Sequence, residues 1–98
     1  MAYSDDLVQK VWEKGLVVPS NDPKVYRQDA CRAWICRKEY GNRNSQYGWE
    51  IDHIKPSGPD SLDNLQPLQW ENNVDKSDGK LKCNVTAQGD KNTKRLFK

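Results

Sequence analysis

The chain has 98 residues, 35% of them hydrophobic and 31% charged, and its formal net charge at pH 7 is +2. A chain this short suits one domain with a single modest core, which excludes a division into two cores. No apolar run approaches the length of a membrane-spanning helix and the N-terminus lacks the apolar core of a signal peptide, so we expect a cytoplasmic protein that does not bind membranes.

The first thirty residues predict a helix followed by a loop. Ser4, Asp5 and Asp6 are typical of a helix N-terminus, because acidic side chains interact favourably with its positive end. Apolar residues then recur at helical spacing, at Leu7, Val8, Val11 and Trp12. We expect this helix to end at Gly15 and its apolar face to lie in the core.

Strands are expected next. The run Ala33-Trp34-Ile35 within residues 29–37 fits a short strand, and residues 39–48, with two Gly and two Asn, predict a turn. A second strand over residues 49–55 is expected to stop at Pro56. Residues 62–67 predict a short extended return, residues 68–76 a helix that ends before Asp78-Gly79, and residues 84–86 one further strand.

The charge of the chain is unevenly distributed. Residues 1–73 hold nine Lys or Arg against eleven Asp or Glu, whereas residues 74–98 hold seven against three. The basic tail, residues 80–98, fits contact with a phosphate backbone, but a soluble, frayed terminus explains it equally well.

The three cysteines, Cys31, Cys36 and Cys83, are an odd number without a Cys-x-x-Cys pair. This pattern predicts neither a disulfide framework nor a structural zinc site, and buried or bystander thiols are favoured over a metal site built from the three.

Residues 49–76 place the only histidine of the chain beside a carboxylate. Asp52 precedes His53, Asn64 follows His53 after eleven residues, and Asn73 follows nine residues later. A phosphodiester hydrolase needs a general base near neutral pH, oxygen ligands for a hard divalent cation and a group that orients the base. A lone histidine in a strand is more often structural, so the hypothesis depends on the surrounding residues.

These surrounding residues resemble the HNH endonuclease family of the ββα-metal fold. The similarity lies in WEIDHIKP at residues 49–56, LDNLQPL at residues 62–68 and the closing Asn72-Asn73-x-x-Lys76, about a third of the chain. Residues 39–49 also resemble small free-standing bacterial and phage members. The resemblance implies one α+β domain over residues 1–98, with a β-hairpin and helix at about residues 33–78, an added N-terminal helix and short extra strands.

The resemblance also implies roles for four residues. Asp52 and Asn73 would hold one divalent cation through oxygen, and His53 would remove a proton from the attacking water. Asn64 would hold the hairpin and accept a ring N–H from His53. Position 73 is Asn where many members have His, so Mg²⁺ or Mn²⁺ is favoured over Zn²⁺ or Ni²⁺.

Further residues are assigned to the substrate or to support. Lys76, and less directly Arg43 and Lys55, would neutralise phosphates. Glu50 and Gln69 are secondary: Glu50 is expected to pair with an arginine, and Gln69 to share a helical face with Asn73 and Lys76.

One geometric condition must be met, and other functions remain open. Ideal alternation puts Asp52 and His53 on opposite faces of a strand, so a bend before Pro56 is needed to bring them to one pocket. The expected partner is nucleic acid, with double-stranded DNA favoured. A catalytically inactive nucleic-acid-binding module with the same fold is the alternative, and a structural domain without nucleic acid is a third reading.

Overall fold

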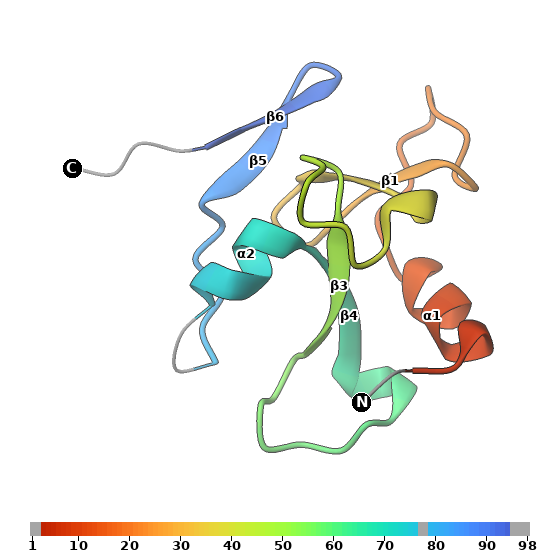
Figure 1. Cartoon of the computed structure of the whole chain (residues 1–98), viewed down its shortest axis with the longest axis vertical. Coiled ribbons are helices and arrows are strands. Elements are labelled where there is room, and N and C mark those ends of the chain that lie inside the picture. Colours follow the sequence, from red (N-terminus) through yellow and green to blue (C-terminus); the bar gives the residue numbers. More distant parts are fainter. Residues whose placement is uncertain (1–2, 77–78, 95–98) are drawn as a thin grey trace.

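The structure is a computed structural model that describes residues 3–76 and 79–94 (Figure 1). In chain order its α-helices and strands are α1 (Asp5–Trp12), β1 (Tyr26–Gln28), β2 (Trp34–Cys36), β3 (Trp49–His53), β4 (Leu65–Gln69), α2 (Trp70–Asp75), β5 (Val85–Gln88) and β6 (Lys91–Lys94). Short 3-10 helices also occur at Arg37–Glu39 and at Leu62–Asn64, so the predicted extended return begins only at Leu65. The strands form three antiparallel pairs, β1–β2, β3–β4 and β5–β6. The α+β class expected from the sequence is confirmed. Within the described residues, no helix is long and apolar enough to cross a membrane.

Helix α1 supplies much of the core. The Ser4 side chain accepts a hydrogen bond from the Leu7 amide and caps the helix, as the sequence predicts. The helix ends at Trp12, three residues before Gly15, because the next amides bond back to Val11 and Trp12 in tight turns. The rings of Trp12 and Trp49 lie 5.3 Å apart and join α1 to the β3–β4 hairpin. The buried residues of this core are Val8, Val11, Trp12, Ile35, Trp49 and Leu65.

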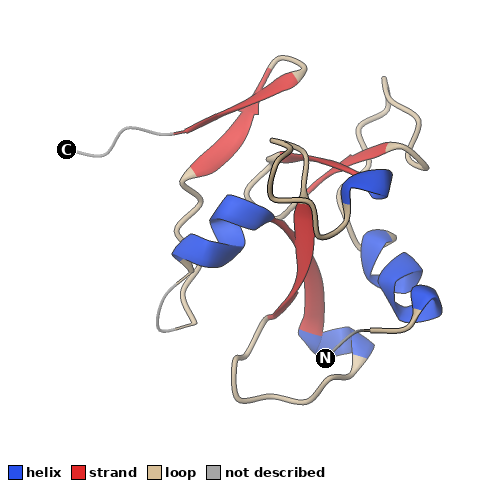
Figure 2. Cartoon of the chain, viewed as in Figure 1, coloured by secondary structure: helices blue, strands red, loops and turns tan. Residues whose placement is uncertain are grey.

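The β3–β4 hairpin lies between the two helices and runs directly into α2 (Figures 1 and 2). Its register runs from Trp49 opposite Gln69 to His53 opposite Leu65. Helix α2 begins at Trp70, so the prediction that it starts at residue 68 is wrong: Leu68 is buried in β4, and Gln69 is the N-cap. The helix ends at Asp75, and Lys76 is its C-cap, close to the predicted end at residue 76.

A buried carboxylate fixes the start of α2. Asp29 accepts four hydrogen bonds, from the amides of Cys31, Ala33 and Gln69 and from the side chain of Asn72. Burial raises the pKa of Asp29 above its ordinary value, although these hydrogen bonds act in the opposite direction. The carboxylate therefore ties the turn before β2 to the first turn of α2.

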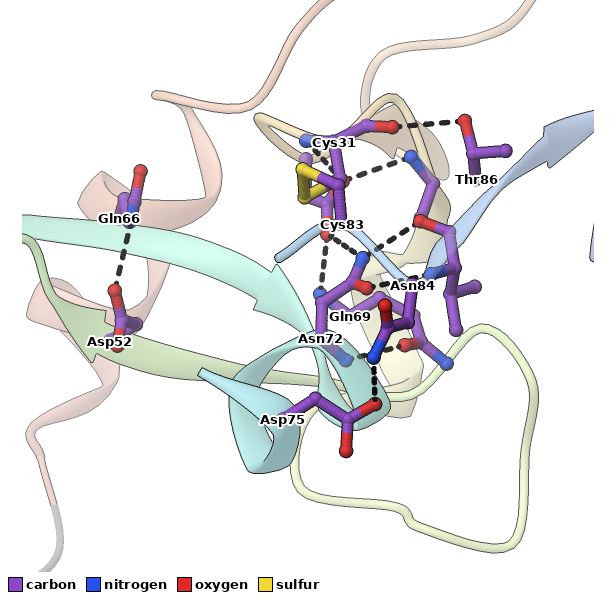
Figure 3. Close-up of a disulfide and its surroundings, with 12 residues drawn as sticks. Cys31, Asp52, Gln66, Gln69, Asn72, Asp75, Cys83, Asn84 and Thr86 are labelled. Carbon is purple, nitrogen blue, oxygen red and sulfur yellow. Dashed lines mark hydrogen bonds between the residues drawn. A yellow bond between two sulfur atoms is a disulfide. The ribbon is translucent and has the colours of Figure 1, made fainter. Parts of the chain in front are cut away.

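Cys31 and Cys83 form a disulfide, so the prediction of buried or bystander thiols is wrong for these two residues (Figure 3). Asn72 lies beside it and bonds both the amide and the carbonyl of Val85, and Thr86 donates to the Cys31 carbonyl. These contacts bring Cys83 to Cys31 across 52 residues of sequence. Cys36 is a buried free thiol, as expected.

The C-terminal segment is more ordered than a frayed tail. Residues 85–94 form the β5–β6 hairpin around Gly89-Asp90, with Gly89 at a φ of +64°. The frayed-terminus interpretation is therefore wrong for this part of the segment, and residues 95–98 lie outside the described residues. The signal for a hairpin was the Gly-Asp pair itself, which is typical of two-residue turns.

Reduction of the disulfide is expected to destabilise the protein strongly. A cross-link that closes a loop of 52 residues removes conformational freedom from the unfolded chain. By loop-closure reasoning it stabilises the fold by about 2–4 kcal/mol, which corresponds to a fall of roughly 10–25 °C in Tm on reduction. Thermal unfolding with and without dithiothreitol measures this, and a Cys31→Ser variant should show a low Tm that the reductant no longer changes. An unchanged wild-type Tm would contradict the pairing.

Candidate functional site

A pocket of about 370 Å³ lies beside β3 and the C-terminal end of α2. Strand β3 ends at His53 and the chain bends at Ile54 and Lys55, ahead of Pro56. Asp52 and His53, which ideal alternation would separate, both line this pocket, and four of the residues predicted from the motif are among its lining. The lining residues are Ile51, Asp52, His53, Pro56, Asn73, Lys76 and Gly79.

Asp52 is buried and is held through one of its two oxygens. Its Oδ2 accepts a hydrogen bond of 2.9 Å from Gln66 Nε2, and Gln66 lies directly opposite it in the β3–β4 register (Figure 3). The same oxygen lies 2.8 Å from Lys76 Nζ. No residue that the structure describes donates a hydrogen bond to Asp52 Oδ1, so this oxygen is available to another ligand.

Lys76 is a buried partner of Asp52. Its side chain is 6% exposed, and that of Asp52 is 9% exposed. The Lys76 ammonium also donates to the His53 carbonyl at 2.5 Å and lies close to that of Ile54. In this geometry Lys76 fixes Asp52 and the end of β3, and its contact with a substrate phosphate stays a prediction.

The ring of His53 is oriented by Asp60, an acid that was not among the residues predicted for the site. His53 Nε2 lies 2.5 Å from Asp60 Oδ1, and Asp60 belongs to the loop between β3 and β4. A carboxylate at this distance favours the tautomer with hydrogen on Nε2, which leaves the lone pair of Nδ1 to accept a proton. In the sequence, only the presence of an acidic residue seven positions after His53 could have indicated this contact.

Asn64 holds the loop and not the imidazole. Its Oδ1 accepts from the Lys55 amide, and its Nδ2 donates to the carbonyls of Lys55 and Pro59. A Cβ atom at Gly58 would lie 2.6 Å from Asn64 Nδ2, so a larger residue there would have to displace the Asn64 amide. The expected role in holding the hairpin is confirmed, whereas the expected hydrogen bond from the His53 ring to Asn64 is wrong.

Asn73 is bonded to Glu50, which is paired with Arg43. Asn73 Nδ2 donates to Glu50 Oε1 at 2.9 Å, and Arg43 binds both oxygens of Glu50 at 2.7 and 3.0 Å. The hydrogen bonds from Arg43 hold the pKa of Glu50 below its ordinary value. Glu50 is thus the partner of an arginine, as predicted, and Arg43, which also lies over the Trp70 ring, is already engaged.

Gln69 and Lys55, like Arg43, Glu50 and Asn64, lie outside the pocket lining. Gln69 is fully buried as the N-cap of α2, where its Oε1 accepts from the amides of Glu71 and Asn72, so it does not share a helical face with Asn73. Lys55 is exposed at the start of the loop beside the pocket, where its predicted contact with phosphate stays a prediction.

The donor set of the pocket fits a hard cation. Over residues 3–76 and 79–94, no three His, Cys, Asp or Glu side chains are grouped to hold a metal ion. The candidate ligands are instead one carboxylate oxygen, Asp52 Oδ1, and one amide oxygen, Asn73 Oδ1, which also accepts no hydrogen bond from the described residues. As metal ligands, these two oxygens would suit Mg²⁺ or Mn²⁺ better than Zn²⁺ or Ni²⁺.

Comparison with known proteins gives no independent assignment. No protein-family model matches the chain, and no curated protein or solved structure shows significant similarity to it. The chemistry of the pocket therefore has to be argued from its own residues.

Proposed function

We propose that the protein is a metal-dependent endonuclease of the HNH type, with a ββα-metal core, that hydrolyses phosphodiester bonds, most readily those of double-stranded DNA. The observation that carries this proposal is the single pocket lined by Asp52, His53 and Asn73. Each of the three side chains is anchored through one polar atom: Asp52 Oδ2, His53 Nε2 and Asn73 Nδ2. The second polar atom of each side chain has no hydrogen bond to the described residues. The direct succession of β3, β4 and α2 supports the proposed core.

In the proposed reaction, His53 Nδ1 removes a proton from a water molecule, whose oxygen attacks the phosphorus atom. The bond from phosphorus to the 3′ oxygen then breaks, leaving a 5′ phosphate and, after proton uptake from solvent, a 3′ hydroxyl. Asp60 stabilises the imidazolium that forms on His53 and keeps the ring in place. A divalent cation held by Asp52 and Asn73 would stabilise negative charge on the phosphoryl group and the departing oxygen.

The distribution of charge is consistent with a nucleic-acid partner. Residues 74–98 hold seven Lys or Arg against three Asp or Glu, and Lys80 and Lys82 are exposed just after Gly79 of the pocket lining. Phosphate contacts of this kind make binding depend strongly on salt. The domain is thus proposed to bind the nucleic-acid backbone beside the pocket.

Plasmid nicking tests the proposal. Purified wild-type protein with Mg²⁺ or Mn²⁺ is expected to convert supercoiled plasmid to nicked circles, and EDTA is expected to stop the reaction. His53→Ala protein, purified in parallel, controls for contaminating nucleases. Salt-dependent DNA binding without nicking by either protein would instead support the inactive nucleic-acid-binding module, and the absence of salt-dependent binding would contradict both functions.

A further inference from the structure

Three side chains from separate segments form a hydrogen-bonded chain that ends at the pocket. Arg43 lies in the loop before β3, Glu50 lies in β3 and Asn73 lies in α2. Arg43 Nε and Nη2 donate to Glu50 Oε2 and Oε1, and Asn73 Nδ2 donates to the same Oε1. Of the three, only Asn73 lines the pocket.

The chemistry of this chain determines which end of the Asn73 amide faces Glu50. A carboxylate paired with arginine accepts hydrogen bonds and has none to donate, whereas an asparagine amide has one donating end and one accepting end. Asn73 must therefore turn Nδ2 towards Glu50, which leaves Oδ1 at the opposite end of the amide. In the reversed orientation, Asn73 Oδ1 would face Glu50 Oε1, and both atoms are acceptors. The NH₂ group would then face away from Glu50, where it could not bind a cation.

The arginine makes this orientation specific. Its planar guanidinium binds both oxygens of Glu50 in a fork, so the carboxylate is fixed in direction as well as in position. The Arg43 side chain is 56% exposed and that of Glu50 is 20% exposed, so the pair lies at the surface and not in the core.

We propose that Glu50, held by Arg43, is a positioning residue for the metal site: it orients the Asn73 amide so that Oδ1 is the atom presented to a divalent cation. This proposal rests on the proposed function only in assigning Asn73 as a metal ligand. The simpler explanation is a surface ion pair that stabilises the fold slightly and leaves the metal site unaffected.

Metal binding by the free protein separates the two explanations. In Glu50→Gln, the side-chain amide at position 50 can donate as well as accept, so it no longer dictates which end of Asn73 faces it. Groups that orient metal ligands typically contribute 10- to 100-fold to affinity, so the Kd for Mn²⁺ is expected to rise by about 10-fold or more. Isothermal titration of the protein with MnCl₂, without nucleic acid, measures this directly.

Glu39→Gln is the matched control. The Glu39 carboxylate also accepts a hydrogen bond from an asparagine amide, that of Asn42 at 2.7 Å, but neither residue lines the pocket. The Mn²⁺ Kd of this variant is expected to equal that of the wild type. Circular dichroism of all variants checks that the fold is retained.

Exchanging the two groups provides a second test. In Glu50→Gln combined with Asn73→Asp, the glutamine can donate to one oxygen of the carboxylate introduced at position 73 and still accept from Arg43. Both ends of the side chain at position 73 are then oxygen. The double variant is expected to bind Mn²⁺ at least as tightly as the wild type. Wild-type affinity in Glu50→Gln alone, or no recovery in the double variant, would overturn the proposal.

The results also separate this proposal from the enzymatic one. Weaker Mn²⁺ binding in Glu50→Gln, recovery in the double variant and no plasmid nicking by the wild type would support the positioning role and reject hydrolysis. Nicking by the wild type with an unchanged Kd in Glu50→Gln would reject the positioning role alone. A wild-type protein that binds no Mn²⁺ would overturn both.

Discussion

Replacing His53 by alanine is expected to lower the rate of plasmid nicking by about 10²- to 10⁴-fold, the usual contribution of a general base. His53 is the only histidine in the chain, and its Nδ1 is the acceptor left over when Nε2–H donates a hydrogen bond to Asp60. Without this acceptor, the attacking water must give its proton to bulk solvent. Nicking rates at saturating Mn²⁺, with protein in excess over plasmid, measure the step without interference from product release.

Two further expected results distinguish loss of the base from loss of the metal site. The alanine variant is expected to bind Mn²⁺ with wild-type affinity, because the proposed ligands are Asp52 and Asn73. Added imidazole is expected to restore part of the rate, since the base is missing while the rest of the pocket is intact. Nicking by His53→Ala at the wild-type rate would contradict the assignment of His53 as the base.

Asp60→Asn tests the partner of the base. The amide oxygen of asparagine can still accept from His53 Nε2, but it no longer stabilises the imidazolium by charge. The nicking rate is therefore expected to fall by less than in His53→Ala, while Mn²⁺ binding remains unchanged. A fall as large as that of His53→Ala would show that the charge of Asp60, and not only its geometry, is needed.

The elements that the sequence predicts well are those determined by nearby residues. The Ser4 cap and the apolar spacing of α1 act within two turns of one helix, and β3 is a short strand that ends where the chain bends before Pro56. The start of α2 differs from the prediction because pairing with β3 and the hydrogen bond from the Gln69 amide to Asp29 keep Leu68 and Gln69 in the strand. Tertiary contacts here outweigh local helix preference.

In the candidate site, too, the sequence predicts which residues come together but not the contacts that hold them. The motif places Asp52, His53 and Asn73 together, because strand, loop and helix follow one another closely. The contacts that anchor them were not predicted, because each joins residues 7 to 24 positions apart: Lys76 and Gln66 hold Asp52, Asp60 holds His53, and Glu50 holds Asn73. The Cys31–Cys83 disulfide, across 52 residues, was beyond sequence reasoning for the same reason.

The disulfide bears on the expected cytoplasmic location. Disulfides persist in oxidising compartments and are rare in the cytosol, so a cytoplasmic protein would populate mainly the reduced form. Because Cys31 lies two residues from Asp29 and Val85 two residues from Cys83, the disulfide connects the two groups that bond Asn72 at the start of α2. Reduction is therefore expected to loosen the helix that carries Asn73.

Replacing Lys76 by methionine is expected to lower the free energy of unfolding by about 3–5 kcal/mol, the usual cost of removing one member of a buried ion pair. Methionine retains much of the apolar stem but removes the ammonium that lies 2.8 Å from Asp52 Oδ2. The Asp52 carboxylate then stays buried with Gln66 as its only partner among the described residues. Urea denaturation of the metal-free proteins measures the difference.

Lys94→Met is the matched control for charge and side-chain length. Lys94 pairs with Glu71 at 2.6 Å, but its side chain is 67% exposed, so solvent screens the interaction and stability is expected to change little. A metal-free Lys76→Met protein as stable as the wild type would show that the Asp52 pair is solvated and does not support the fold.

The Lys76 variant also tests whether Asp52 is a metal ligand. Without the ammonium, a divalent cation is the group proposed to neutralise Asp52 in the pocket, and a ligand that binds only the folded state stabilises it by mass action. Mn²⁺ is therefore expected to raise the Tm of Lys76→Met by more than it raises that of the wild type. If Mn²⁺ raises the Tm of both proteins equally, removing the Lys76 ammonium has not changed metal binding. The cation would then bind away from Asp52.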